Sequence, residues 1–127
     1  MNTEYRDGLL FTEMSLKWLG KTVDIDNIVI DTGASHTLIS SDVAESIGIL
    51  YANGDRIVSM YGIGGQEFAF RKKIDGVLLG RKLMEGTELD FGYLGDDGIN
   101  GLIGLDLLMD SKAVVDLNKL QITFASN

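Results

Sequence analysis

The chain has 127 residues, of which 45% are hydrophobic, and its formal net charge at pH 7 is −8. This length suits one domain with a single hydrophobic core, and the apolar content argues against a disordered chain. The sequence has no cysteine and one histidine, which excludes disulfides, thiolate catalysis, cysteine-based zinc or iron–sulfur sites, and multi-histidine metal sites within one chain.

Alternating side chains predict the first strands. Residues 9–18 (LLFTEMSLKW) have the period of a half-buried strand, with Thr12 on the same face as the apolar side chains of Leu10, Met14, Leu16 and Trp18. A second strand is predicted over 23–30, with Ile28 and Ile30 pointing inward. It leads into the turn Asp31-Thr32-Gly33-Ala34-Ser35, and residues 37–40 are predicted to form a short strand.

The middle of the chain predicts one short helix and one hairpin. The helix is expected within residues 40–48, where Ser41 or Asp42 can cap its beginning and Gly48 can end it. Residues 56–61 and 66–71 are the predicted arms of a hairpin around Gly-Ile-Gly-Gly.

The last third predicts further short strands. Residues 73–94 are expected to turn at Gly80-Arg81, and residues 96–124 to form a loop, a short apolar strand, a brief helix and a hairpin that turns at Asn118-Lys119. Sixteen glycines and no proline fit many tight turns between strands. The predicted fold is therefore mainly β, with one or two short helices.

Asp31 is the residue that most needs an explanation, because it ends a buried strand. A carboxylate in a low-dielectric site must find hydrogen-bond donors or take up a proton. Thr32 offers a hydroxyl, Gly33 permits a close backbone approach, and Ser35 is predicted to donate a hydrogen bond to the carboxylate. The turn is therefore suited to holding an acid in place.

One acid does not suffice for peptide hydrolysis, which needs one group to take a proton from water and another to protonate the carbonyl oxygen. Two carboxylates in contact do both, because like charges split their apparent pKa values. The sequence has no second Asp-(Thr/Ser)-Gly, since Asp75-Gly76 and Asp97-Gly98 lack the hydroxyl residue. A dyad therefore requires a second copy of Asp31 across a two-fold axis.

Asp-Thr-Gly is also an ordinary turn after a strand, so two further segments matter. The glycine-rich hairpin at 60–68 (MYGIGGQEF) can close over a cleft, and it is no phosphate loop because the Lys-Ser/Thr that should follow is missing. The segment at 100–108 (NGLIGLDLL) predicts a buried strand that passes close to another backbone at Gly104. Each segment alone also fits a plain hairpin or core strand.

In this order the three segments resemble the retropepsin-like aspartic proteases, single-domain relatives of the pepsin family, from about residue 9 to residue 124. The resemblance implies a closed, mostly β acid-protease barrel with a flap hairpin, in one domain over residues 1–127. It implies an aspartic endopeptidase that acts as a homodimer on a peptide or protein substrate, without metal, cofactor or covalent intermediate.

The resemblance also assigns roles to residues. Asp31 would be general base and acid, Thr32 would brace the two turns across the dimer axis, and Gly33 would let them approach. Gly104 would pack under the catalytic turn. The flap that binds substrate would be Tyr61, Gly62, Ile63, Gly64 and Gly65.

One feature departs from the retroviral branch of that family. Leu105-Asp106 stands where those enzymes usually have arginine followed by Asp or Asn, which places the chain closer to the cellular and bacterial branches. The ion pair of that arginine is then missing, and the dimer must be stabilised differently. Residues 120–126 (LQITFAS) are a candidate for the interleaved sheet that viral chain ends form.

Other readings of the sequence are weaker. Ser35, His36 and Asp31 do not suit a Ser-His-Asp triad, because neighbours on an extended chain point to opposite faces. The acidic segment 90–98 lacks calcium-loop spacing and is expected to be a solvated loop. The main alternative is a catalytically inactive retropepsin-fold module for dimerisation or peptide binding.

Partners and location follow from charge and composition. Basic residues are scattered apart from 71–73, which argues against a nucleic-acid surface. No apolar run approaches the ~18 residues that a membrane span needs. The first 20 residues do not read as a signal peptide, and with the absence of cysteine this predicts a cytoplasmic protein.

Overall fold

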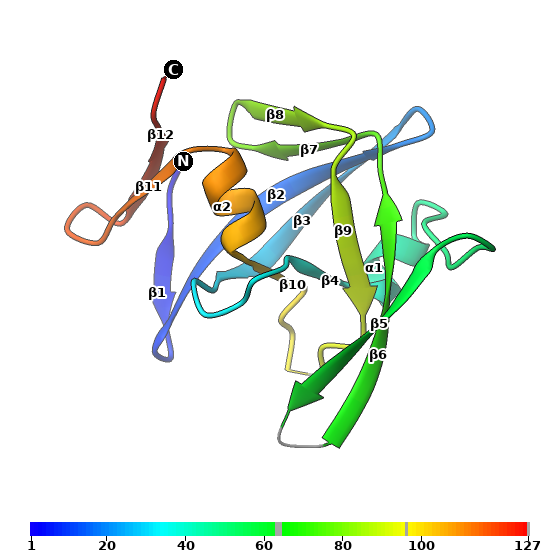
Figure 1. Cartoon of the computed structure of the whole chain (residues 1–127). Coiled ribbons are helices and arrows are strands. Elements are labelled where there is room, and N and C mark those ends of the chain that lie inside the picture. The colour runs from blue at the N-terminus through cyan, green and yellow to red at the C-terminus, as the bar shows by residue number, and fades with distance from the viewer. Residues whose placement is uncertain (63–64, 96, 127) are drawn as a thin grey trace.

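A computed structural model describes residues 1–62, 65–95 and 97–126 of the chain. These residues form twelve strands and two short helices (Figure 1). The elements are β1 (Glu4–Arg6), β2 (Leu9–Trp18), β3 (Lys21–Ile30), β4 (Leu38–Ser40), α1 (Ser41–Glu45), β5 (Arg56–Gly62), β6 (Gly65–Lys73), β7 (Gly76–Leu79), β8 (Lys82–Glu85), β9 (Glu88–Gly92), β10 (Gly101–Ile103), α2 (Leu105–Asp110), β11 (Ala113–Asp116) and β12 (Gln121–Phe124).

Ten strands form one sheet, in the order β5-β6-β9-β4-β10-β3-β2-β7-β8 with β1 paired to β2 beside this path. The mainly β fold with two short helices is confirmed. Within the described residues the terminal strands β5 and β8 are not paired with each other, so the sheet is open and hydrogen bonds do not close it into a barrel.

The period of two that predicted the first strands is confirmed. Thr12, Met14 and Leu16 of β2 are buried, while Glu13 between them is exposed. β2 pairs antiparallel with β3, in which Ile28 is fully buried. Met14, Leu16 and Ile28 join one core cluster with residues of β4, α1, β7, β9 and α2, among them Ile39, Ala44, Val77, Phe91 and Leu107.

Two details of the sequence prediction are wrong. β1 was not expected, and it pairs with the beginning of β2. The predicted side-chain cap of α1 is absent: the helix follows Ser40, and no side chain there bonds to the first turn. The helix instead ends as predicted, with Gly48 at φ +83° in the turn that follows.

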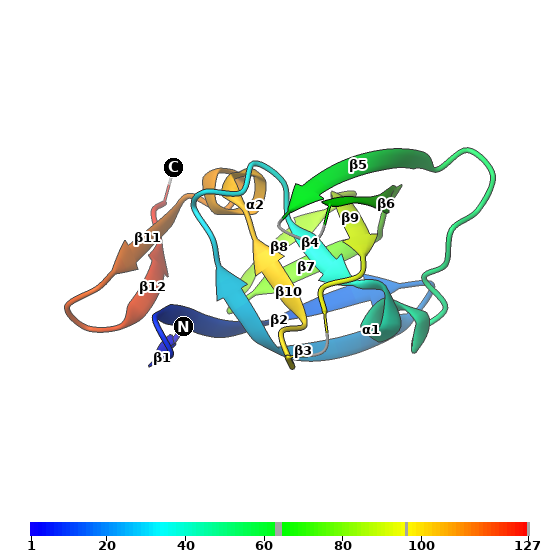
Figure 2. The same ribbon diagram turned by 90° about the horizontal axis from the view of Figure 1, so that it is seen from below.

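β10 brings two distant parts of the chain together. It lies between β3, to which it is parallel, and β4, to which it is antiparallel. Leu102 is opposite Val29 on one side and Leu38 on the other. The segment that follows β3 and the segment that follows β10 therefore emerge side by side from the same end of the sheet (Figure 2).

A separate two-stranded sheet, β11 and β12, stands beside the N-terminus (Figure 2). Its turn spans residues 117–120, where the Asp116 side chain accepts the backbone N–H groups of Asn118 and Lys119. The predicted C-terminal hairpin is thereby confirmed.

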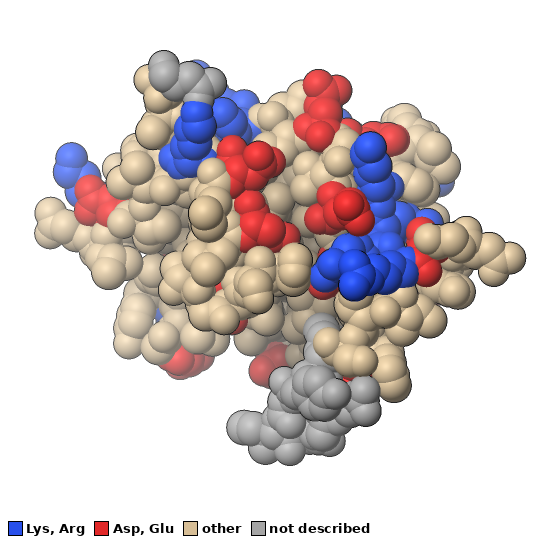
Figure 3. Space-filling view, viewed as in Figure 1, with Lys and Arg blue, Asp and Glu red and all other residues tan. Residues whose placement is uncertain are grey.

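Charged side chains are mixed on the face shown in Figure 3. Lysine and arginine form separate groups with acidic residues between them, so this face offers no continuous basic surface. Neither of the two described helices has the length and apolar character that crossing a bilayer requires.

Candidate active site

Asp31 directly follows the last residue of β3 and is half-buried. Its backbone N–H donates to the Ile103 carbonyl at 2.9 Å, so the pairing of β3 with β10 continues to the turn. The Gly33 N–H donates to Oδ1 of the Asp31 carboxylate at 3.0 Å, and the Ala34 N–H donates to the Asp31 carbonyl at 3.1 Å. The turn therefore holds the acid with a backbone donor.

The predicted hydrogen bond from Ser35 to the Asp31 carboxylate is wrong. In the part of the chain that the structure describes, the exposed Ser35 hydroxyl makes no such bond, and the Gly33 N–H takes that place. Ser35 contributes through its backbone instead, because its carbonyl accepts the Asp106 N–H at 3.3 Å. Thr32 and Gly33 are exposed at the tip of the turn.

Gly104 lies directly beneath the turn. A Cβ built on it would be 2.8 Å from the Ala34 carbonyl oxygen and 2.8 Å from the His36 carbonyl carbon, distances at which backbone must shift. The next residue fixes the contact, since the Leu105 N–H donates to the Ala34 carbonyl at 2.8 Å. The glycine that ends β10 therefore permits the close packing of two backbones.

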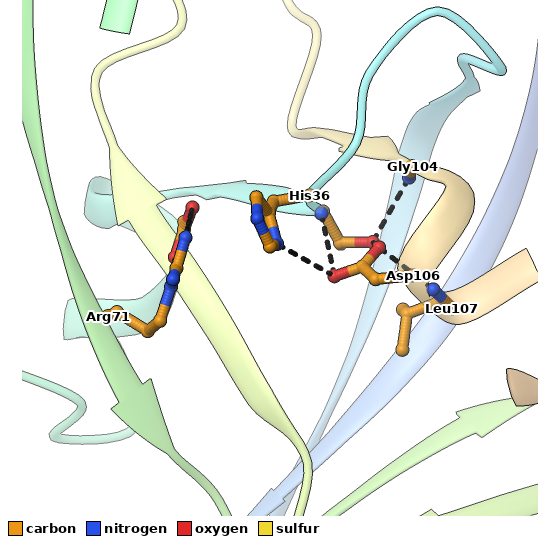
Figure 4. A network of polar contacts seen from close by, with 7 residues as sticks. His36, Arg71, Gly104, Asp106 and Leu107 are labelled. Carbon is orange, nitrogen blue, oxygen red and sulfur yellow. Dashed lines mark hydrogen bonds and ion pairs between the residues drawn. The ribbon is translucent and has the colours of Figure 1, made fainter. Parts of the chain in front are cut away.

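A polar pair that the sequence did not reveal, buried Thr37 and partly exposed Asp106, holds this arrangement together (Figure 4). Thr37 has no exposed surface, and its hydroxyl donates to Asp106 Oδ1 at 2.7 Å while accepting the Gly104 N–H at 3.0 Å. The Thr37 N–H donates to Asp106 Oδ2 at 3.0 Å, and the Leu107 N–H donates to Oδ1 at 2.8 Å. One carboxylate thus ties the segment that follows the Asp31 turn to the beginning of α2.

His36 lies at the rim of this network. Its side chain is half-exposed, and Nδ1 is 4.0 Å from Asp106 Oδ2, a contact that is an ion pair when the imidazole is protonated. His36 is therefore an exposed residue of the segment that follows the Asp31 turn.

The expectation that residues 90–98 form a solvated loop is wrong at Asp90. It lies within β9, opposite Arg71 of β6, and its side chain is only 9% exposed. Arg71 Nε is 2.7 Å from Asp90 Oδ1 and a second guanidinium nitrogen is 3.2 Å from Oδ2, a bidentate pair. The hydrogen bonds to Asp90 raise the pKa of Arg71 above its ordinary value.

This ion pair connects to the segment that follows the Asp31 turn. The Asp90 N–H donates to the Thr37 carbonyl at 3.1 Å, and β9 runs parallel to β4. A continuous path of polar contacts therefore runs from β6 to α2, through Arg71, Asp90, Thr37 and Asp106. Sequence patterns gave no signal for it, because all four partners are distant from one another along the chain.

The predicted flap corresponds to the hairpin of β5 and β6. Its arms are paired up to Tyr61 with Gln66 and Gly62 with Gly65. Ile63 and Gly64, the predicted tip, lie outside the described residues.

The base of this hairpin is anchored by charge and by aromatic packing. Phe70 of β6 stacks on Phe91 of β9, with ring centroids 5.3 Å apart. Lys72 Nζ is 2.7 Å from Asp55 Oδ2. Burial would raise the pKa of Asp55, but hydrogen bonds from Lys72 and the Ala52 N–H outweigh it and hold the pKa below its ordinary value.

Among the described residues, no three His, Asp or Glu side chains are grouped so as to hold a metal ion.

The sequence model of a family described as aspartyl protease matches residues 14–107, most of the chain. The chain belongs to the aspartyl protease family. A crystal structure of a retropepsin-like aspartic protease from Rickettsia conorii has a similar fold, with a TM-score of 0.64 at 22% identity, over 91% of this chain and 82% of that one. None of the curated proteins matches this chain in sequence.

The retropepsin-like resemblance that the three motifs suggested is thereby confirmed. In this member of the aspartyl protease family the matched region contains the Asp31 turn, both arms of the β5–β6 hairpin and β10 with Gly104. It ends at Leu107, within α2, so the β11–β12 hairpin lies beyond it.

Proposed function

We propose that this aspartyl protease is an endopeptidase that acts as a homodimer, with one Asp31 from each chain sharing a water molecule. One observation carries the proposal: the single Asp-Thr-Gly turn presents its acid at the surface. Asp31 is half-buried, and Thr32 and Gly33 beside it are exposed. A second copy has room to approach this turn, and it is the source of the second carboxylate.

The reaction follows from two adjacent carboxylates that share one proton. The ionised carboxylate takes a proton from water, whose oxygen attacks the peptide carbonyl carbon, while the protonated one gives its proton to the carbonyl oxygen. The tetrahedral intermediate then collapses as the C–N bond breaks: the carboxyl that took the proton from water gives it to the leaving nitrogen, and the other carboxylate takes a proton back from a hydroxyl of the intermediate. The Gly33 N–H, 3.0 Å from Asp31 Oδ1, keeps the carboxylate oriented for both steps.

The remaining roles are part of the same proposal. Thr32 braces the two turns across the axis, and Gly33 leaves space for their approach. Tyr61, Gly62, Ile63, Gly64 and Gly65 form the flap that binds an extended substrate, with backbone groups available for strand-like hydrogen bonds.

We propose that residues 1–127 are one retropepsin-like domain. We also propose a cytoplasmic location, which the absence of cysteine supports.

Cleavage of a peptide library, read by mass spectrometry, tests the function. The wild type is expected to cut, statine-type transition-state mimics to inhibit it, and chelators to leave it unchanged. Asp31→Asn is expected to abolish cleavage. Asp7→Asn is the matched control, because it makes the same chemical change in an exposed turn at φ +51°, which asparagine tolerates.

Two outcomes would overturn the proposal. Proteolysis that persists in Asp31→Asn contradicts the mechanism. A wild type that binds peptides of the library but never cleaves them favours the alternative, an inactive peptide-binding or dimerisation module.

A further inference from the structure

The chain contains two Asn-Gly pairs, Asn53-Gly54 and Asn100-Gly101. Asparagine is chemically labile, and a following glycine favours its deamidation, because no Cβ hinders the glycine nitrogen from reaching the asparagine side chain. The reaction also requires a side-chain amide that can rotate and a peptide nitrogen that is not held in place. The sequence does not separate the two pairs, but the fold does.

Asn53 and Gly54 lie in the exposed loop between α1 and β5 (Figure 2). The Asp55 N–H donates to the Ala52 carbonyl at 3.0 Å and Gly54 has φ +98°, so these four residues form a turn with glycine at its third position, as in type II. Within the described residues, neither the Asn53 side chain nor the Gly54 N–H makes a hydrogen bond. A Cβ built on Gly54 would meet no atom within 4 Å, so the surroundings leave this peptide free to move.

Asn100 and Gly101 are fixed by hydrogen bonds and by burial. Asn100 Nδ2 donates to the carbonyl and to Oδ1 of Asp26, at 3.0 and 3.1 Å. The backbone N–H of Asn100 donates to the Asn27 carbonyl, and its carbonyl accepts the Ser40 N–H. Gly101 is buried at the beginning of β10, between β3 and β4. Ring closure at this pair would require opening the middle of the large sheet.

We propose that Asn53 is a site of spontaneous modification, where asparagine becomes aspartate and isoaspartate while Asn100 stays intact. The Gly54 nitrogen attacks Cγ of Asn53 and closes a succinimide ring. The bond from Cγ to Nδ2 breaks, and Nδ2 leaves as ammonia with the proton that Gly54 gave up. Water then adds to one carbonyl carbon of the ring and breaks its bond to the Gly54 nitrogen. Addition at Cγ gives aspartate, and addition at the backbone carbonyl gives isoaspartate, whose main chain runs through the side chain.

The product changes the loop that anchors the β5–β6 hairpin. Asp55 Oδ2 accepts the Ala52 N–H at 2.9 Å and lies 2.7 Å from Lys72 Nζ of β6. Isoaspartate lengthens the main chain between Ala52 and Asp55 by one methylene, so the two hydrogen bonds between these residues cannot both keep their geometry. The new carboxylate also places a second negative charge near Asp55, which opposes the ionised form of that side chain. The modification is therefore expected to loosen the base of the hairpin.

Incubation of the folded protein in mildly alkaline buffer, followed by peptide mapping with mass spectrometry, tests the site. Asn53 should convert at least about tenfold faster than Asn100, because a core strand reacts only when it opens. In urea the two pairs should convert at similar rates, since the fold no longer protects Asn100. Asn53→Gln is the control, because its longer side chain closes the ring far more slowly. Conversion of Asn53 no faster than that of Asn100 in the folded protein, or the same ratio of rates in urea, overturns the inference.

Hydrogen exchange of the incubated protein tests the consequence for the loop. The Asp55 N–H, which bonds to the Ala52 carbonyl, should exchange faster in the fraction that carries isoaspartate, while the β2–β3 ladder stays unchanged. Asn53→Asp supplies the charge without the extra methylene and should raise the exchange rate less. Unchanged exchange at Asp55 in the isoaspartate fraction contradicts the loosened base. Neither measurement uses peptide cleavage, so both outcomes are independent of the proposed function.

Discussion

Thr37→Val is the substitution that most sharply tests the polar network under the Asp31 turn. It keeps the side-chain volume but removes the hydroxyl that joins Asp106 to the Gly104 N–H at 2.7 and 3.0 Å. A hydrogen bond to a charged group contributes about 1.5–3 kcal/mol, and a buried N–H left without a partner costs about 1–3 kcal/mol. Because Thr37 is fully buried, water cannot replace its hydroxyl at the Gly104 N–H, whereas the Asp106 side chain is 26% exposed and its carboxylate can be hydrated. The expected loss of stability is therefore about 3 kcal/mol.

Urea unfolding at one fixed protein concentration measures this loss, since dimerisation makes stability depend on concentration. Thr12→Val is the matched control: that threonine is also buried, but its hydroxyl makes a single hydrogen bond, to the Asn2 carbonyl at 3.1 Å. It should lose about 1 kcal/mol. Thr37→Ser, which keeps the hydroxyl, should recover most of the stability. A loss in Thr37→Val no larger than in Thr12→Val would refute the reasoning.

Three further substitutions address neighbouring contacts. Gly104→Ala puts a Cβ 2.8 Å from backbone of the turn and should cost about 1–3 kcal/mol and most of the peptide cleavage rate; unchanged cleavage contradicts the close packing. Arg71→Met leaves Asp90 buried without its partner and should cost about 3–5 kcal/mol in urea unfolding, where a loss below about 1 kcal/mol would speak against the pair. Lys72→Met should lower the free energy of unfolding at pH 7, and the difference in this free energy from wild type should narrow below pH 3.8. A difference that does not change with pH contradicts the role given to Asp55.

The sign of the last effect follows from the pKa of Asp55. The carboxyl has a lower pKa in the folded chain than its ordinary value of 3.8. Its contribution to stability is therefore complete above that ordinary value and is lost as the pH falls through the folded-state value. Removing Lys72 removes the hydrogen bond and the charge that lower this pKa, so the two proteins should differ least in acid.

Much of this fold was predictable because its signals are local. The alternation in residues 9–18 predicted β2 with the correct buried face, and the turn residues Asn118 and Lys119 predicted the last hairpin. Asp31 was found because a carboxylate after an apolar strand needs an explanation, and Gly104 because a glycine at the end of a short apolar strand indicates a close approach. Each of these signals spans only a few residues.

The rest was not predictable because it depends on pairs far apart in sequence. Thr37 reads as one more strand residue, and Asp106 only as the acid that follows Leu105 in the third motif; only the fold places their side chains 2.7 Å apart. Asp90 sits in an acidic segment that resembles a loop, and its burial is explained by Arg71 on another strand. The family resemblance implied a closed barrel, but the hydrogen bonds of the described strands leave the sheet open. Strand order could not be predicted because it depends on pairs far apart in sequence.

These pairs give the candidate site a common support. The Arg71–Asp90 pair stands where β6 meets β9, and the Asp90 N–H reaches the Thr37 carbonyl. Thr37 in turn holds Asp106 and Gly104. The position of the Asp31 turn is therefore tied to the base of the β5–β6 hairpin, the proposed flap, through polar contacts that are mostly buried.

The most direct measurement of the central claim mixes wild-type and Asp31→Asn chains in equal amounts and allows their subunits to exchange. If each active site needs one Asp31 from each of two copies, only wild-type pairs cleave peptide, and activity should be about one quarter of that of the same total amount of wild type. Activity of one half would mean that a single chain carries the whole site, which would contradict the account.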